Sequence, residues 1–228
     1  MIKGNLLSAY RHIINLFVTV RHLSTRQILY QIKSRLTRKN IFLKVESPIL
    51  CDDIVNVSFK QTNFTPRWTG GSVCLENNTF TFLNLSKSYR AINWCDDSLG
   101  GLWLDHLHYF RFLELFTNNK NCITKSYQLI IDWNANKGSC SKAFWPPYNA
   151  SERAFCISRW LLLSKEHLDR DQISQILLIV FQDIDFVSRN LEWNLDGNHL
   201  LKNLSIIWWG IEIFDKKITT KWEGLLNN

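Results

Sequence analysis

The sequence predicts a mainly helical protein, and three observations support this prediction. From Leu104 onward, apolar residues recur at the three- and four-residue spacing of amphipathic helices. A capping signal precedes the clearest of these patterns. Residues 45–103, by contrast, are divided by glycine and proline into short alternating pieces, which are typical of strands and turns. With 228 residues, 46% of them hydrophobic, the chain is long enough to bury one sizeable core.

Residues 1–44 are predicted to form a helical arm. An apolar face repeats at helical spacing through the first half of this segment, and Ser24 with Gln27 has the spacing of a capping box for a second helix. The arm is rich in arginine and lysine. We interpret these residues as a solvated helix face, and a helix that lies on a membrane surface is the alternative.

Residues 45–103 are predicted to be a lead-in to the helical part rather than a separate domain. Residues 73–83 alternate in polarity around Asn77 and Asn78, which is the pattern of a β-hairpin. Trp94 belongs to the same region. Its indole is expected either to reach a ligand cleft or to pack in the core.

Residues 104–228 are predicted to hold successive helices. The expected helices cover residues 104–117, 122–133, 151–164, 170–191 and 199–215. The fourth is the clearest, because Ile173, Leu177 and Ile184 share one face and Asp169 with Gln172 forms a capping pair. Successive antiparallel helical hairpins can build a bundle, a solenoid or a toroid.

The pair Asn198 and His199 is the feature that indicates chemistry. It follows Gly197 and begins the last predicted helix, where backbone N–H groups lack partners and an anion is favoured. An amide can donate to a carboxylate, and an imidazole can move a proton near neutral pH. The alternative is that Asn198 only caps the helix, which is a common role of asparagine.

The composition suits an anionic partner. Lysine and arginine number 27 against 20 aspartates and glutamates, which gives a formal charge of +7 at pH 7. That charge fits a uronate polysaccharide and a nucleic acid equally well. The ten tryptophans and fourteen phenylalanines can form a large core or line a sugar cleft, because flat rings stack on pyranose faces.

Three segments resemble the heparinase II/III-like polysaccharide lyases. Residues 189–201, which contain R-N-L-E and G-N-H-L-L, are similar to the Asn-His segment of that family. Residues 80–84 with 102–110 are similar to its F-x-F-L-N and L-W-x-x-N-L-H-Y-F pattern. Residues 145–153 are similar to its W-x-P-Y-x-x-S-x-R pattern. The segments follow the order of the family, and the resemblance covers roughly residues 5–228.

This resemblance implies a fold and a reaction. The fold would be an incomplete (α/α) toroid, preceded by the helical arm and the small β-hairpin. The reaction would be β-elimination at C4 of a uronic acid in an anionic polysaccharide, in which the carboxylate must be neutralised before the C5 proton is removed. Asn198 would neutralise the carboxylate, and His199 would share that task or accept the proton.

The resemblance also implies contacts with the substrate from residues 145–153. Trp145 and Tyr148 would line the sugar cleft. Ser151 is predicted to cap the helix that follows, so that Arg153 falls in its first turns. Arg153 would then pair with a uronate or sulfate in bidentate fashion, or else brace a neighbouring carboxylate.

A second set of expected contacts comes from the predicted helix that starts at residue 104. His108 and Tyr109 would contact the sugar, or would only wall the toroid. His106 stands where the family usually has asparagine, which puts a binding role for His106 in doubt. Trp94 is the remaining candidate for a sugar contact.

The resemblance further implies segments beyond this sequence. Such lyases carry further toroid helices, a tyrosine that protonates the leaving oxygen, and a C-terminal β-sandwich. We therefore expect the 228-residue chain alone to be a poor or inactive catalyst. Uncovered apolar faces with Ile207, Trp208 and Ile211 would favour self-association. The rival functions are a non-catalytic glycan-binding fragment and a basic helical interaction protein.

Several classes of protein find no support in the sequence. No nucleotide-binding glycine loop, H-E-x-x-H or G-x-S-x-G occurs, so neither a cofactor nor a metal is expected. The six cysteines lack metal-ligand spacing and are expected to be free thiols. No apolar run approaches the roughly 20 residues of a membrane span. No signal peptide is visible, so a cytoplasmic location is the default, with the periplasm as the alternative if the N-terminus is incomplete. A nucleic-acid partner is not expected.

Overall fold

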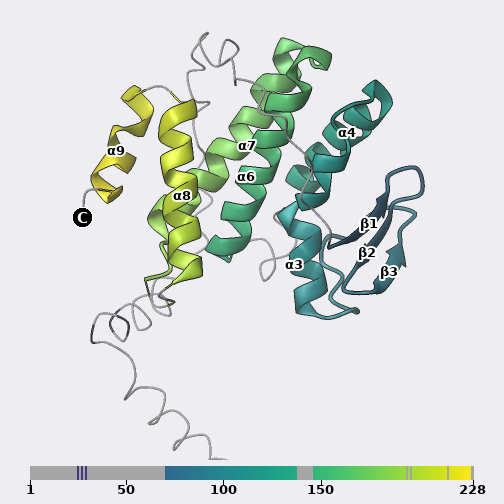
Figure 1. Cartoon of the computed structure of the whole chain (residues 1–228), viewed down its shortest axis with the longest axis horizontal. Helices are drawn as coiled ribbons and strands as arrows, with labels where there is room; N and C mark the ends of the chain where they lie inside the picture. Colours follow the sequence, from purple (N-terminus) through teal and green to yellow (C-terminus); the bar gives the residue numbers. More distant parts are fainter. Residues whose placement is uncertain are drawn as a thin grey trace, which may run out of the picture.

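The computed structural model describes residues 25, 27, 29, 70–137, 146–193, 195, 197–214 and 216–226, the last range without the side chains of residues 217 and 218. The predicted N-terminal arm therefore lies almost entirely outside the described residues. So does Trp145. The described part is mainly helical and carries one small sheet at its N-terminal side (Figure 1).

The sheet has three antiparallel strands, β1 (Gly71–Cys74), β2 (Thr79–Phe82) and β3 (Leu85–Ser88), in the order β1-β2-β3. The predicted hairpin is confirmed by the β1-β2 pair. The third strand was not predicted. It follows a two-residue turn in which Leu83 and Asn84 both have positive φ, 53° and 61°. Such turns usually carry Asn-Gly, so Leu-Asn gives a weak signal.

The inner face of β2 joins the sheet to the helices. Phe80 and Phe82 are at most 1% exposed. The Phe80 ring lies 5.6 Å from that of Phe112, and the Phe82 ring lies 5.2 Å from that of Trp103. Trp103 also donates from Nε1 to the carbonyl oxygen of Leu85. The sheet and the helices therefore share one hydrophobic core.

The helical elements are α3 (Gly101–Tyr109), the 3-10 helix η2 (Arg111–Leu115), α4 (Lys120–Asn136), α6 (Pro147–Ser164), the 3-10 helix η3 (Lys165–His167), α7 (Arg170–Arg189), α8 (Asn198–Ile213) and α9 (Lys216–Leu226). All five predicted helices occur with shifted bounds, and α9 is additional. The first is interrupted at Phe110, which adopts the left-handed conformation with φ 56°. The buried Phe110 ring packs between Trp94 and Trp133, and this packing maintains the break.

The two predicted helix starts had different outcomes. The capping box of α7 is confirmed, since Gln172 N–H donates to Asp169 Oδ1 at 2.8 Å and Asp169 N–H donates to Gln172 Oε1 at 3.0 Å. The prediction that Ser151 caps a helix is wrong. α6 already begins at Pro147, because proline has a helical φ and no N–H to satisfy at a first helical position.

The helices form two layers (Figure 1). In the first layer, α3 with η2, α6 and α8 run in the same direction. The shared direction follows from contacts whose residue numbers increase together along both helices. These are Arg111–Glu152 and Glu114–Arg159 between η2 and α6, and Tyr148–His199 and Ser158–Trp209 between α6 and α8. α4 and α7 pack in the second layer. There the Tyr127 hydroxyl donates a hydrogen bond to Gln175 Oε1, and Lys137 Nζ donates one to Gln182 Oε1. The observed class is therefore a layered arrangement of helical hairpins beside a small sheet.

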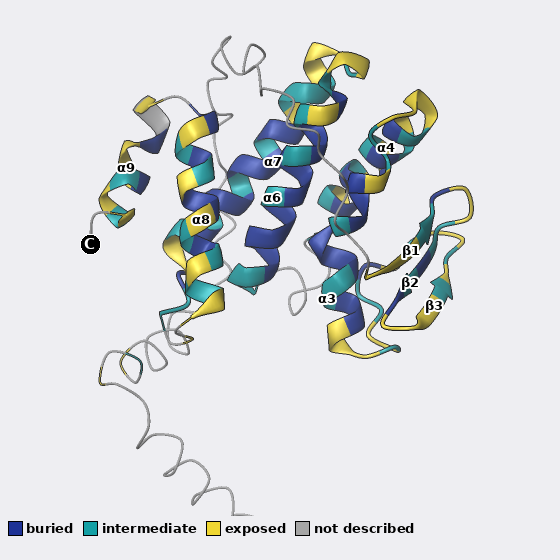
Figure 2. Ribbon diagram, viewed as in Figure 1, coloured by how far each residue is buried: buried dark blue, intermediate teal, exposed yellow. Residues whose placement is uncertain are grey.

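The core runs through α6, which is mostly buried, and through α7 from Ile176 onward (Figure 2). Its largest buried side chains include Trp94, Trp103, Trp133, Trp160 and Trp222, so much of the tryptophan excess is core. The prediction that Ile207 of α8 lies on an uncovered apolar face is wrong, because Ile207 is fully buried among the core residues. Trp208, in contrast, is 54% exposed.

Candidate active site

Three elements bring aromatic and polar side chains to one end of the first layer. Because α6 and α8 run in the same direction, their first turns lie next to each other. The Tyr148 ring centroid lies 4.5 Å from that of His199 and 5.9 Å from that of Tyr109, at the end of α3. Tyr148 and His199 are both partly exposed. Tyr109, Tyr148 and His199 are thus three predicted site residues that the structure brings together.

His199 is oriented by Glu192. Its Nδ1 lies 3.2 Å from Glu192 Oε1, and the two side chains are 45% and 11% exposed. A carboxylate can only accept a hydrogen bond, so Nδ1 carries the proton. In the neutral ring this leaves Nε2 with a lone pair. His199 therefore has the arrangement of a general base that is supported by a carboxylate.

Asn203 in turn holds Glu192. The Asn203 side chain is fully buried. Its Oδ1 accepts from the backbone N–H of Glu192 at 3.0 Å, and its Nδ2 donates to Glu192 Oε2 at 3.3 Å and to Ser151 Oγ at 3.1 Å. Ser151 donates onward to the carbonyl oxygen of Pro147. This network links α6, α8 and the segment before α8, so the position of His199 is set by buried groups.

A second carboxylate, Glu152, is shared by two cations. Arg111 Nε lies 2.9 Å from Glu152 Oε2, and Lys202 Nζ lies 2.8 Å from Oε1. Burial by itself would raise the pKa of Glu152, but the hydrogen bonds from Arg111 and Lys202 outweigh burial and lower it. The Arg111 guanidinium also lies 4.9 Å from the centre of the Tyr109 ring. Two cationic side chains, both paired with Glu152, therefore lie beside the Tyr148 and His199 rings.

Asn198 is the first residue of α8, and Gly197, with φ 101°, occupies the capping position. The alternative in which Asn198 only caps the helix is therefore wrong. The Asn198 side chain is exposed and makes no hydrogen bond to the described residues. It lies at the positive end of α8, where the first backbone N–H groups have no helical partner.

Arg153 lies in the core and not at the exposed end of α6. Its side chain is 0% exposed, and its Nε and Nη2 donate to the two carboxylate oxygens of Asp183 at 2.8 Å and 2.7 Å. The guanidinium also lies 4.2 Å from the centre of the Trp133 ring. This geometry favours the bracing role that the sequence left open, and it removes Arg153 from the candidate site.

His108 and Trp94 are also buried, at 0% and 2% exposure. Trp133 Nε1 donates to His108 Nδ1 at 3.1 Å, so His108 carries its proton on Nε2 and donates to the carbonyl oxygen of Trp94 at 2.9 Å. Burial lowers the pKa of His108 to about 3. Trp94 in turn donates to Asp132 Oδ2. Neither residue offers a surface to a ligand, so both belong to the core.

The sequence prediction missed five residues of this cluster, namely Arg111, Glu152, Glu192, Lys202 and Asn203. Helical spacing contains a signal for three of them. Glu152 follows Tyr148 by one turn, and Lys202 and Asn203 follow His199 by one turn. Arg111 and Glu192 lie outside that periodicity, and only the packing of η2 and of the segment before α8 brings them into the site.

The described residues also bear on metal sites, disulfides and membrane-spanning helices. Within residues 70–137 and the later described ranges, there is no group of three or more histidine, cysteine or acidic residues that could hold a metal ion. Cys74, Cys95, Cys122 and Cys156 are free thiols, as predicted for these four. Among the helices that the structure describes, none combines the length and apolar character that a bilayer span requires.

A scan against protein-family models and searches of curated proteins and of solved structures gave no match. Fold and site together define a layered helical protein with a partly exposed cluster of tyrosine, histidine and asparagine beside cations that are paired with a carboxylate.

Proposed function

We propose that this chain is the N-terminal toroid part of a heparinase II/III-like polysaccharide lyase, which acts by β-elimination on a uronate-containing anionic polysaccharide. The observation that supports the proposal is the convergence of the three family-like segments. Residues 102–109 lie in α3, residues 147–153 form the first turns of α6, and residues 198–201 form the first turn of α8. These segments are far apart in the sequence, and their aromatic and polar side chains meet around His199.

The contacts fit the two demands of the reaction. The negative charge of the uronate carboxylate must be stabilised by hydrogen-bond donors. The exposed Asn198 amide can donate to this carboxylate beside the amino end of α8. Arg111 and Lys202 place N–H donors in the same cluster, where both pair with Glu152. His199 Nε2 can then remove the C5 proton, since Glu192 holds the opposite nitrogen.

The electrons of the broken C5–H bond form the C4–C5 double bond, and the C4–oxygen bond breaks. The leaving oxygen then needs a proton. Tyr148 lies against His199, and its hydroxyl makes no hydrogen bond to the described residues, so it can donate that proton. The family resemblance implies a tyrosine for this role from a further segment, and a Tyr148→Phe variant distinguishes the two sources.

The test is an elimination assay with heparin, hyaluronan and alginate. The unsaturated uronate product absorbs ultraviolet light, whereas the intact polysaccharides do not. We expect slow product formation by the unmodified chain and a loss of roughly a hundredfold or more in His199→Ala. His167→Ala is the matched control, because His167 is an exposed histidine beyond the far end of α6 and should retain full activity.

Two other outcomes would replace the proposal. Glycan binding without any elimination product would favour a non-catalytic glycan-binding fragment. Binding to oligonucleotides that falls steeply with salt, with no binding to the three polysaccharides, would favour a basic interaction protein.

A further inference from the structure

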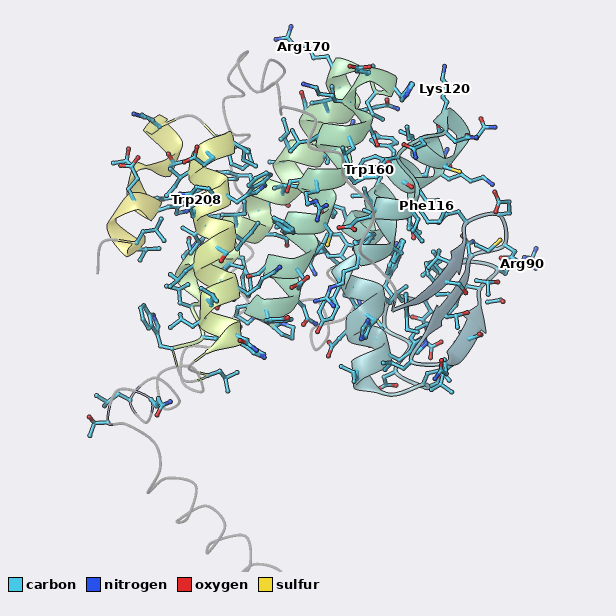
Figure 3. All side chains as sticks on the ribbon, in the orientation of Figure 1. Arg90, Phe116, Lys120, Trp160, Arg170 and Trp208 are labelled. Atoms are coloured by element: carbon cyan, nitrogen blue, oxygen red, sulfur yellow. The ribbon has the colours of Figure 1, made fainter. Side chains whose placement is uncertain are left out.

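An open groove lies on the first helical layer, beyond the candidate site. It encloses about 440 Å³ and is lined by Phe155 from α6, by Leu204, Ser205, Trp208 and Trp209 from α8, and by Leu226 from α9. Trp208, which is labelled in Figure 3, is 54% exposed. An exposed tryptophan beside further aromatic rings is a large apolar surface that a ligand can cover.

The wall of this groove is held in place by contacts beneath it. Trp209 donates from Nε1 to Ser158 Oγ at 2.8 Å, which fixes the plane of the indole. The Phe155 ring meets the Trp209 ring edge to face at a centroid distance of 5.8 Å. A ligand would therefore meet a surface that is formed in advance, and it would lose less entropy on binding.

Lys202 contacts one residue of the candidate site and one residue of the groove wall. The Lys202 ammonium lies 2.8 Å from Glu152 Oε1 on the site side and 4.8 Å from the centre of the Phe155 ring on the groove side. The guanidinium carbon of Arg159 lies 5.4 Å from the same ring centre, and Arg159 Nη1 pairs with Glu114 at 2.8 Å. Cationic side chains thus border an aromatic surface, and this combination suits a sugar that carries a carboxylate or sulfate.

The two sites are separated by more than one sugar ring. Phe155 follows Tyr148 by seven residues on α6, which corresponds to about 10 Å of helix. Trp208 follows His199 by nine residues on α8, or about 14 Å. A single monosaccharide cannot touch both ends, whereas an extended oligosaccharide can.

We propose that this groove is a second sugar-binding subsite, in which a pyranose face stacks on Trp208 and the acidic group of the sugar lies near Lys202. The subsite rests on the proposed function and narrows its substrate to a polysaccharide that is held over several sugar units. The competing occupant is a second copy of the chain.

The test compares Trp208→Ala with the unmodified chain by calorimetric titration of heparin and alginate, each as disaccharides and as decasaccharides. We expect decasaccharide affinity to fall about tenfold and disaccharide affinity to stay unchanged, because only the longer ligand reaches the groove. Leu201→Ala is the matched control. Leu201 is an exposed apolar residue of the same helix, 65% exposed, and does not line the groove.

The result that overturns the subsite is equal decasaccharide affinity in Trp208→Ala and the unmodified chain, or no decasaccharide binding at all. Sedimentation that changes only with Trp208→Ala, with glycan affinity constant, would assign the groove to contacts between copies. If decasaccharide binding depends on Trp208 but no elimination product forms, the subsite stands and the proposed lyase activity fails. If His199→Ala removes the product while Trp208→Ala changes nothing, only the subsite fails.

Discussion

Arg153 and Asp183 form a bidentate ion pair that joins α6 to α7 in the core. Both hydrogen bonds are shorter than 3 Å, at 2.8 Å and 2.7 Å, and neither side chain is more than 3% exposed. The guanidinium also stacks on Trp133, so the pair links α4 to the same junction. α6 also carries Tyr148 and Glu152, one helical turn apart, so this junction holds the helix that presents both side chains to the candidate site.

Removing one member of this pair should strongly destabilise the fold. In Asp183→Ala the guanidinium of Arg153 would stay buried without its carboxylate, and we expect the free energy of unfolding to fall by about 3–5 kcal/mol. Urea denaturation measures the change. Lys125→Ala is the control, because it removes an exposed pair with Glu76 at 3.5 Å and should leave the free energy of unfolding nearly unchanged. Equal effects in the two variants would contradict the assignment.

The sequence alone could not decide whether Arg153 binds a ligand or braces a neighbouring carboxylate. Periodicity alone predicted most of the helices, because apolar residues at helical spacing must face a core. Yet Glu152 and Arg153 are neighbours in the chain, and about 100° of helix rotation sends one to the partly exposed cluster and the other to the core. No local pattern indicates which polar residue has a buried partner thirty residues away.

Two of the remaining differences come from long-range packing, and one could have been predicted locally. The break at Phe110 depends on the rings of Trp94 and Trp133, which lie elsewhere in the sequence. The early start of α6 could have been read from Pro147, since proline favours a first helical position. Asn198 and His199 were proposed from the sequence, whereas the hydrogen bonds from Asn203 to Glu192 behind His199 become visible only in the fold.

Stability should decrease as the pH falls below neutrality, and His108 should be one cause. Burial lowers the folded-state pKa of His108 to about 3, against about 6.5 in the unfolded chain. Above pH 6.5 both states are neutral, and below it only the unfolded state takes up the proton. The free energy of unfolding should therefore fall by up to about 1.4 kcal/mol per pH unit between pH 6.5 and 3.

Urea unfolding at pH 7 and pH 5 tests this dependence. Over that interval most carboxylates stay ionised in both states, so histidines dominate the difference. His108→Gln should be less stable at pH 7 and should show a smaller loss between pH 7 and pH 5 than the unmodified chain. A pH dependence that is the same in both proteins would mean that His108 is not the responsible group.

Gly210 should not tolerate a side chain. A Cβ at Gly210 would lie 2.8 Å from the Trp222 ring of α9 and 3.0 Å from Ile184 of α7, where the three helices pack. We expect Gly210→Ala to lower the free energy of unfolding by about 1–3 kcal/mol through overpacking. Gly224→Ala on α9 is the control. Among the described residues, no atom beyond the adjoining stretch of α9 lies within 4 Å of a Cβ there, so alanine should be neutral or stabilise by about 0.5–1 kcal/mol. Destabilisation by both variants to the same extent would show that helix packing is not the cause.

Glu192→Gln tests whether the carboxylate behind His199 serves the reaction or only the fold. Glutamine keeps the shape and still offers Asn203 a partner, so the free energy of unfolding should change little. It no longer provides the charge that stabilises His199 once the ring has taken the substrate proton. We therefore expect kcat for the elimination to fall roughly a hundredfold, with KM nearly unchanged. Glu76→Gln, at an exposed glutamate of the sheet turn, should leave both constants unchanged. If Glu192→Gln unfolds at lower urea while its folded fraction retains full kcat, Glu192 is a structural residue and His199 acts without it.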